Sequence, residues 1–200
     1  MSIVTAVQHS QSIALPPPQT GPAATLMRAL KLRRSTREFA PKPLPREMLS
    51  TLLWVAFGIN RPDSSGRTAP SARNWQEISV YAALADGLFR YDAAGHSLQP
   101  VAAGDLRTLT GMQDFVGHAP LNLVYVADFS RMSDAGAEER AFLAAADTGV
   151  IAQNVYLFCA AAGLATVVRG LVDRKKLSAA MGLGMHERIM LAQTVGFPAA

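Results

Sequence analysis

Two arginines and a hydroxyl stand at alternate positions in the segment Arg33-Arg34-Ser35-Thr36-Arg37. In an extended chain, side chains two residues apart point to the same side, so Arg33, Ser35 and Arg37 can surround one group. Guanidinium groups and a hydroxyl suit the oxygens of a phosphate. A basic helix end that complements the helix dipole explains the same residues without a ligand. The segment therefore indicates either a phosphate site or a basic helix end.

A second segment places hydroxyl and amide side chains at the end of a long polar loop over residues 60–74. Loops of this length without regular structure are usually functional. Pro70 and Ser71 are followed by Asn74 and Gln76, and amides can both donate to and accept from the edge of a heteroaromatic ring. Ordinary turn formation by Pro70, Ser71 and Asn74 is the alternative explanation.

A third segment, residues 163–170, runs from a predicted helix end into a predicted strand and is rich in small residues. Small residues let a backbone approach a flat ligand closely, and backbone amides there could serve a ring nitrogen. A helix C-cap at Gly163 followed by a core strand accounts equally well for this string.

The elements that must position these segments mix helices and strands without a regular β-α-β order. Short helices are predicted to begin near residues 25, 45, 105 and 173, and strands to cover 78–84, 88–91, 121–129, 164–171 and 189–197. The stretch Ala137–Ala162 has no proline and is apolar on most faces, which predicts a long helix at a domain centre or a dimer interface. The pattern predicts an α+β domain with helices packed on a mixed or antiparallel sheet.

Composition limits the partners of this domain. Half of the 200 residues are hydrophobic, which is enough to bury a core, and only 17% are charged, which indicates that a partner covers part of the surface. The net charge of +4 comes from arginines spread along the chain. This spread favours a pocket for a small anion over nucleic-acid binding, although a generic basic surface would give the same charge.

Cysteine usage and the N-terminus predict a cytoplasmic protein with no membrane or nucleic-acid partner. Cys159 is the only cysteine, so no intrachain disulfide can form, and its apolar neighbours predict a buried side chain. No apolar run reaches the ~18 to 20 residues that span a bilayer. Residues 1–24, with their proline run at 16–18, are expected to form an extended arm, and residues 25–200 a single domain.

Several common site motifs are missing from the sequence. It contains no G-x-G-x-x-G fingerprint, no P-loop and no H-E-x-x-H motif. The four histidines are scattered, so no metal site is expected. A separate nicotinamide-binding domain is therefore not indicated.

Taken in order, the three segments resemble the signatures of the nitroreductase superfamily, over nearly the whole chain from about Thr25 onward. The R-x-S-x-R-like signature stands at 33–37, P-S-x-x-N-x-Q stands at 70–76, and the strand region at 168–170 matches the part that lies against the flavin's reactive edge. The resemblance implies the nitroreductase fold with a long central helix at a dimer interface. It implies FMN held by Arg33, Arg34, Ser35, Arg37, Pro70, Ser71, Asn74, Gln76, Val168, Arg169 and Gly170.

In this family the 70–76 segment reaches the flavin bound mainly by the other subunit, so the resemblance implies a homodimer with FMN at the interface. Arg67, Gln113 and Phe115 are expected to line the substrate pocket. The implied activity is hydride transfer from NAD(P)H through the flavin to a small organic acceptor such as a nitroaromatic or quinone. No side chain is expected to act as a catalytic acid or base.

Two alternatives to this activity remain open. Leu15-Pro16, residues 67–72 and Val195-Gly196-Phe197-Pro198 look most like the branch of SagB-type dehydrogenases, which implies oxidation of a heterocycle or saturated bond. A catalytically silent flavin-binding module is the other alternative. It is suggested by a departure from the family, because many members place a basic pair after the last strand. Either Arg34 or Arg169 is expected to substitute here, or FMN is expected to bind more weakly.

Overall fold

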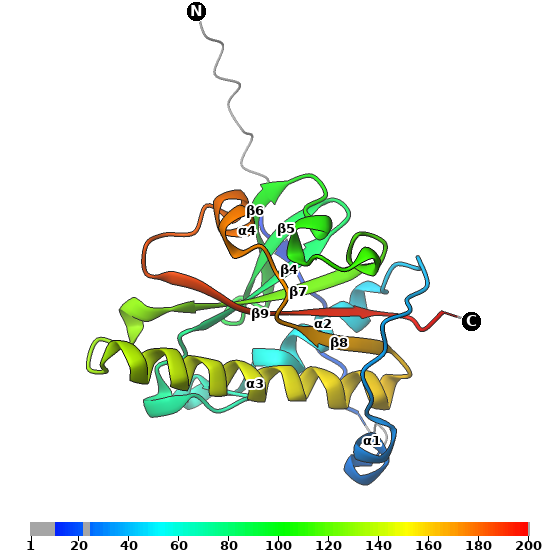
Figure 1. The fold of residues 1–200 in the computed structure, drawn as a ribbon. Coiled ribbons are helices and arrows are strands. Elements are labelled where there is room, and N and C mark those ends of the chain that lie inside the picture. The colour runs from blue at the N-terminus through cyan, green and yellow to red at the C-terminus, as the bar shows by residue number, and fades with distance from the viewer. Residues whose placement is uncertain (1–10, 22–24, 200) are drawn as a thin grey trace, which may run out of the picture.

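A seven-stranded sheet forms the centre of the fold, in a computed structural model that describes residues 11–21 and 25–199. The strand order is β1-β6-β5-β4-β7-β9-β8, and every neighbouring pair is antiparallel. The predicted α+β class is confirmed, and of the two sheet types the antiparallel one is present. Figure 1 shows the long helix α3 along one side of this sheet and α4 on the opposite side.

The bounds of the elements agree closely with several of the predicted ranges. The helices are α1 (Leu26–Leu32), α2 (Arg46–Phe57), α3 (Ala137–Ala162) and α4 (Arg174–Met181). The strands are β1 (Ile13–Ala14), β2 (Ile59–Arg61), β3 (Gly66–Arg67), β4 (Ile78–Leu84), β5 (Gly87–Asp92), β6 (Ser97–Ala103), β7 (Leu121–Asp128), β8 (Ala165–Arg169) and β9 (Glu187–Gly196).

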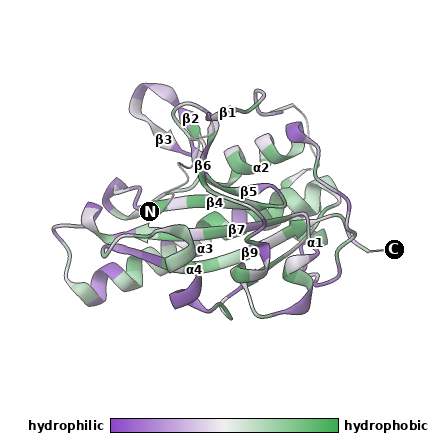
Figure 2. Ribbon diagram, turned by 90° about the horizontal axis from the view of Figure 1, so that it is seen from above, coloured by the Kyte–Doolittle hydropathy of each residue, from purple (hydrophilic) through white to green (hydrophobic). Residues whose placement is uncertain are grey.

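Alternation along the strands supplies a separate core on each face of the sheet. In β4, Ile78, Val80 and Ala82 pack with the buried residues of α2 and α3. Tyr81 and Ala83 point to the other face of the sheet and pack with buried residues of β7 and α4. The hydrophobic residues on the central strands and on α2 are visible in Figure 2. A sheet buried on both faces explains why β7 is apolar almost throughout.

Helix α3 has the predicted bounds and ends at Gly163, whose φ of +70° provides the left-handed cap. Its buried residues, Ile151 and Val155 among them, belong to the core on the α2 side of the sheet. By length and composition alone α3 is apolar enough to cross a membrane. Packing against the sheet accounts for the buried part of that composition.

Three segments differ from the prediction. Residues 60–74, expected to be a loop, contain the short β2–β3 pair. No strand is predicted over 97–103, yet β6 forms there, with a register shift beside Pro100 that accommodates the proline. Where a helix is predicted after Asp105, the structure has only a 3₁₀ turn, Arg107–Thr110, which ends because the backbone of Gly111 is extended. A side chain at position 111 would collide with the Arg169 guanidinium, so glycine is required there.

The proline-rich arm is only partly described, since residues 1–10 and 22–24 lie outside the described ranges. Within residues 11–21, β1 pairs with β6 as an edge strand, and Leu15 is buried in the core. His96 connects this segment to α2, because its ring lies 3.0 Å from the carbonyl oxygen of Pro16 and 2.8 Å from the hydroxyl of Ser50 on α2. The proposed domain boundary at residue 24 lies outside the described residues.

Leu177 tests how strongly α4 stabilises the second face of the sheet. Its side chain is fully buried in the core beneath α4. We expect Leu177→Ala to lower the free energy of unfolding by about 2–5 kcal/mol, because the lost transfer energy adds to the energy of a cavity. Lys175→Ala, at an exposed position of the same helix, should change it by less than about 0.5 kcal/mol. Urea unfolding followed by circular dichroism measures both, and equal effects would contradict this account of the core.

Candidate functional site

The hydroxyl of Tyr156 on α3 connects two of the predicted site segments. It lies 2.8 Å from the Ser35 hydroxyl and accepts a hydrogen bond from the backbone N–H of Val168 at 2.9 Å. The Arg33 guanidinium lies 5.4 Å from the centre of the Tyr156 ring, within the range of a cation–π contact. A further hydrogen bond runs from the Thr36 N–H to the Thr166 carbonyl at 3.0 Å. These contacts place the segment after α1 alongside β8.

A cavity of about 410 Å³ adjoins this cluster. Arg33, Arg34 and Lys31 line it together with Tyr156 and the first residues of β8. Two guanidinium groups, a lysine and hydroxyl groups at one concave surface suit an anionic ligand such as a phosphate. Arg37 is exposed and makes no hydrogen bond or ion pair within the described part of the chain, so its predicted role stays a prediction.

The side chain of Arg169, at the end of β8, points into the protein. It is 4% exposed and donates to the Thr110 carbonyl at 2.8 Å, Asn122 Oδ1 at 3.0 Å and the Thr194 hydroxyl at 2.9 Å. All these acceptors are neutral, and burial lowers the pKa of Arg169 to about 10. The suggestion that Arg169 substitutes for a terminal basic pair is therefore wrong, because its guanidinium is engaged inside the fold. Arg34, exposed on the cavity, has the freedom that this role requires.

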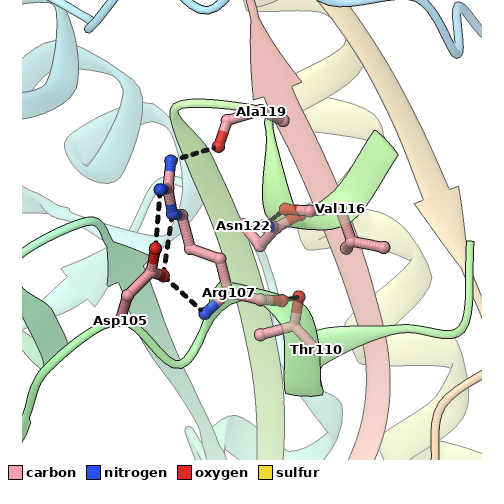
Figure 3. A network of polar contacts seen from close by, with 6 residues as sticks. All are labelled: Asp105, Arg107, Thr110, Val116, Ala119 and Asn122. Carbon is pink, nitrogen blue, oxygen red and sulfur yellow. Dashed lines mark hydrogen bonds and ion pairs between the residues drawn. The ribbon is translucent and has the colours of Figure 1, made fainter. Parts of the chain in front are cut away.

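A polar network holds the segment between β6 and β7, and Figure 3 shows its contacts among residues 105–122. Arg107 donates to both carboxylate oxygens of Asp105, at 2.9 and 2.7 Å, and to the Ala119 carbonyl at 2.9 Å. Asn122 donates to the Val116 carbonyl at 2.8 Å while its oxygen accepts from Arg169. The network fixes both ends of this segment.

Gln113 and Phe115, predicted for the substrate pocket, lie on this fixed segment. The N–H of Met112 donates to the Leu171 carbonyl at 3.3 Å, which places the segment against the chain that leaves β8. Gln113 Oε1 is buried and has no hydrogen-bond partner within the described residues. The Phe115 ring lies 5.4 Å from the Phe39 ring. The structure thus brings Gln113 and Arg169 together beside Gly111, and the predicted role of Gln113 in a substrate pocket stays a prediction.

The 70–76 segment is closed by its own hydrogen bonds and is strained. Ser71 Oγ accepts from the Gln76 N–H at 3.0 Å, and Gln76 Nε2 donates to Asn74 Oδ1 at 3.1 Å. Arg73, Asn74 and Gln76 all have positive φ angles near 50°, a region that costs energy for residues other than glycine. Such strain gathers at functional segments, where the surrounding structure maintains it.

Asp147 anchors this segment to α3, and a buried carboxyl group, that of Glu77, directly follows the segment. Asp147 Oδ2 accepts from the Ala72 N–H at 2.8 Å. Glu77 is fully buried, and neither of its carboxylate oxygens has a hydrogen-bond partner within the described residues. Burial raises the pKa of Glu77 to about 7, and the negative charge of Asp147 adds to the shift. Near neutral pH the carboxyl group that follows the strained segment is therefore partly protonated.

Within one chain, the two clusters remain apart. Asp147 anchors the 70–76 segment and Tyr156 anchors the 33–37 segment, and the nine positions between them on α3 correspond to a rise of about 14 Å. Ser71, Asn74 and Gln76 are therefore not gathered with Arg33 and Ser35 around a single tyrosine. Arg67 belongs with the first set, since its Nε donates to Gln76 Oε1 at 2.8 Å.

Tyr156 and Glu77 were not among the residues singled out in the sequence. Tyr156 lies within a long apolar helix, and its contact with Ser35 joins positions 121 residues apart. Glu77 carried a usable signal, since it is a lone acidic residue directly before an apolar strand. A charged side chain at such a position is either paired with another group or buried at a cost in free energy.

Fold and site together define a class of protein: an α+β domain with an antiparallel sheet between helices and a cationic cavity beside its edge strand. A profile of the Nitroreductase family matches residues 30–197. The chain is similar to a crystal structure described as a nitroreductase from Ralstonia eutropha JMP134, with 47% identity, a TM-score of 0.91, and coverage of 97% of this chain and 92% of that chain. It is 30% identical to a protein described as a nitroreductase from Methanocaldococcus jannaschii, over 69% of this chain and 74% of that one.

A third comparison shows the fold alone. The microcin synthetase McbBCD complex of E. coli, solved with truncated pro-MccB17 bound, matches with a TM-score of 0.73 at 20% identity, over 100% of this chain and 85% of that chain.

The chain belongs to the nitroreductase family. It is accordingly an oxidoreductase of the flavin type. Members of this family generally use FMN and are typically dimeric.

Glu77 should make the stability of the protein depend on pH. Its pKa is raised from 4.5 to about 7 in the folded protein, so the folded state binds more protons than the unfolded state between these values. The free energy of unfolding should therefore fall as the pH rises from about 4.5 to about 7 and then level off. Glu77→Gln should remove this fall and be more stable than the wild type above pH 7. Glu47→Gln, at an exposed position of α2, is the control and should keep it. Thermal unfolding from pH 4.5 to 8 tests this, and an unchanged slope for Glu77→Gln would contradict it.

Proposed function

We propose that this protein is an FMN-dependent oxidoreductase that passes a hydride from NAD(P)H through the flavin to a small organic acceptor such as a nitroaromatic or quinone. The observation that carries the proposal is the convergence of Arg33, Ser35 and the Val168 amide on Tyr156, with Arg33 over its ring and the other two at its hydroxyl, beside a cationic cavity. These are the donors that a phosphorylated ring system requires, and family membership supplies the flavin chemistry.

The residues present fit FMN at three levels. Arg33 and Arg34 line the cavity and would neutralise the phosphate, with Ser35 donating a hydrogen bond from its exposed position. The backbone of Val168, Arg169 and Gly170 would orient the ring edge, because the buried guanidinium fixes that stretch. Gln113, whose buried oxygen lacks a partner, would accept a hydrogen bond from the ligand.

When bound, FMN supplies reversible hydride transfer, so the protein's own task is binding, orientation and exclusion of water. The Phe115 ring packs against the Phe39 ring in a tilted arrangement, and Phe115 would cover one face of the flavin ring against solvent. Among the residues of the cluster, none needs to exchange a proton with the substrate. We therefore assign no catalytic acid or base.

We further propose a homodimer in which the 70–76 segment of one subunit completes the site of the other. Large apolar side chains are exposed on α1 and α3, with Met27 at 74% and Phe142 at 72%. Such exposure is unusual for a monomer and indicates a covered face. The strained Asn74 and its neighbours belong to a segment that lies far along α3 from Tyr156, as a shared site requires. The proposed setting is the cytoplasm, without membrane or nucleic-acid partners.

A second candidate function is oxidation of a heterocycle or saturated bond in a peptide or metabolite. The fold of this chain aligns over its full length with part of the microcin synthetase complex, whose structure contains a bound pro-peptide. At 20% identity this supports the fold, and the substrate class remains a proposal. Reoxidation of the flavin by oxygen during turnover of such a substrate, with no reduction by NAD(P)H, would favour it. A flavin that binds but cannot be reduced would favour a silent module.

Flavin binding and reduction test the main proposal. We expect the purified protein to bind FMN and its visible absorbance to bleach on addition of NADH or NADPH, then recover with a nitroaromatic or quinone. Arg33→Gln should weaken FMN binding by about 10- to 100-fold, since it removes a charged interaction worth about 1.5–3 kcal/mol. Tyr156→Phe should weaken it by about 2- to 10-fold, since the hydrogen bonds of its hydroxyl with Ser35 and Val168 are neutral and worth about 0.5–1.5 kcal/mol.

Lys175→Gln is the matched control for this titration, because it removes one positive charge from the opposite side of the sheet and should leave FMN affinity unchanged. No flavin bound at micromolar protein would refute the proposal. An Arg33→Gln protein with wild-type affinity would refute the assigned phosphate site.

Mixing two inactive variants tests the shared site. In a dimer of Arg33→Gln with Asn74→Ala chains, one site combines both substitutions and the other combines two wild-type residues. Random mixing should therefore restore about a quarter of the wild-type sites, because about half of the dimers are mixed and each has one intact site. FMN-dependent activity after co-refolding measures the recovery. If both residues served the same subunit's site, mixing would restore nothing.

A further inference from the structure

Strands β4 and β5 separate at one end and leave a polar cavity between them. Their pairing stops at Tyr81 and Arg90, although β4 begins at Ile78 and β5 continues to Asp92. A cavity of about 150 Å³ opens there, lined by both strand ends and by Arg67, Gln76 and Arg131. It differs in position from the cavity beside Tyr156, whose lining shares none of these residues.

Two guanidinium groups reach the same residue at this cavity. Arg67 donates from Nε to Gln76 Oε1 at 2.8 Å, and Arg131 donates from Nη1 to the Gln76 carbonyl at 2.8 Å. Arg67 also donates from Nη1 to the Phe57 carbonyl at 3.2 Å. Its Nη2 makes no hydrogen bond within the described residues, and neither does Arg131 Nη2. Each arginine therefore keeps a donor for a ligand.

Nearby carboxylates balance the positive charge here only in part. Arg67 is half-buried, and no carboxylate lies within 4.0 Å of it among the described residues. Arg131 has only Asp128, at 3.6 Å. Asp92 also lines the cavity, but it accepts from the backbone N–H groups of Ala94 and Gly95 in the following turn. Burial lowers the pKa of Arg67, which shows that its charge lacks full compensation. A partly buried cation of this kind is stabilised by an anion.

The size of the cavity limits the ligand to one small group. A volume of about 150 Å³ corresponds to about five water molecules, at about 30 Å³ each. Such a space holds a carboxylate or phosphate group with bound water, and its mostly polar lining favours an oxyanion over an apolar group. Arg67 and Arg131 can offer it donors from two sides, the arrangement in which guanidinium groups bind oxyanions most strongly.

We propose that the cavity between β4 and β5 binds the carboxylate or phosphate group of a small molecule, through Arg67 and Arg131. Gln76 joins this oxyanion site to the strained 70–76 segment, because it accepts from both arginines and hydrogen-bonds to Ser71 and Asn74. An anion that draws the guanidinium groups toward itself weakens their hold on Gln76. The site does not depend on bound flavin, and it goes beyond the proposed FMN function.

Calorimetric titration with inorganic phosphate and with acetate tests the site, at constant ionic strength set by sodium chloride. The Arg33→Gln background is used throughout, because it weakens the phosphate site proposed for FMN. We expect this protein to bind at least one of the two anions. Adding Arg67→Gln or Arg131→Gln should weaken that binding at least about tenfold, the loss expected for one charge-assisted hydrogen bond. Adding Lys175→Gln should leave it unchanged. The preferred anion identifies the ligand group.

Several results would overturn the oxyanion site. Absence of binding in the Arg33→Gln protein would do so, as would equal affinity after Arg67→Gln or Arg131→Gln. Arg131 is exposed, so Arg131→Gln should fold even if Arg67→Gln does not, and circular dichroism verifies the fold of each protein. A protein that fails to bind FMN but binds phosphate through Arg67 would refute the proposed function and keep this site. The reverse outcome would refute only the site.

Discussion

The buried guanidinium of Arg169 is the constraint on which the arrangement around β8 depends. It has no carboxylate partner among the described residues, so its charge is stabilised by neutral oxygens alone, from Thr110, Asn122 and Thr194. These oxygens belong to the segment before β7, to β7 and to β9. Removing any one of these hydrogen bonds would cost about 1.5–3 kcal/mol, because it weakens the solvation of a buried cation. The end of β8 and the segment that carries Gln113 are therefore fixed relative to each other.

Helix α3 extends this control to the rest of the site. Tyr156 holds the segment after α1, and Asp147, nine positions earlier, holds the 70–76 segment. One rigid helix therefore sets the distance between two clusters that neither the sheet nor the loops connect directly. Backbone strain at Arg73, Asn74 and Gln76 can persist because the Asp147 anchor and the internal hydrogen bonds hold the segment in place.

Much of this architecture could be predicted from local sequence. The bounds of α3, the Gly163 cap and the central strand β7 follow from missing prolines, apolar runs and a glycine. The strand order and its antiparallel pairing could not be predicted in the same way, since they depend on contacts between segments distant in sequence. Strand β6 could not be predicted either, because Pro100 is compatible with a strand only beside a register shift. The site was predictable as three segments, but its connections were not. Tyr156 and Arg169 act through partners distant in sequence, and no periodicity reports which way a buried side chain points.

The two-residue strand β1 has a consequence for association of the folded chain. It covers the outer side of β6 and is followed by three prolines, which have no N–H to continue the ladder. At the opposite edge, β8 is partly covered by the 33–37 segment through the bond from Thr36 to Thr166. Both edges are thus blunted against strand addition, which guards a sheet against edge-to-edge aggregation. Contacts between copies of this protein can then form through helices without the sheets associating into open-ended assemblies.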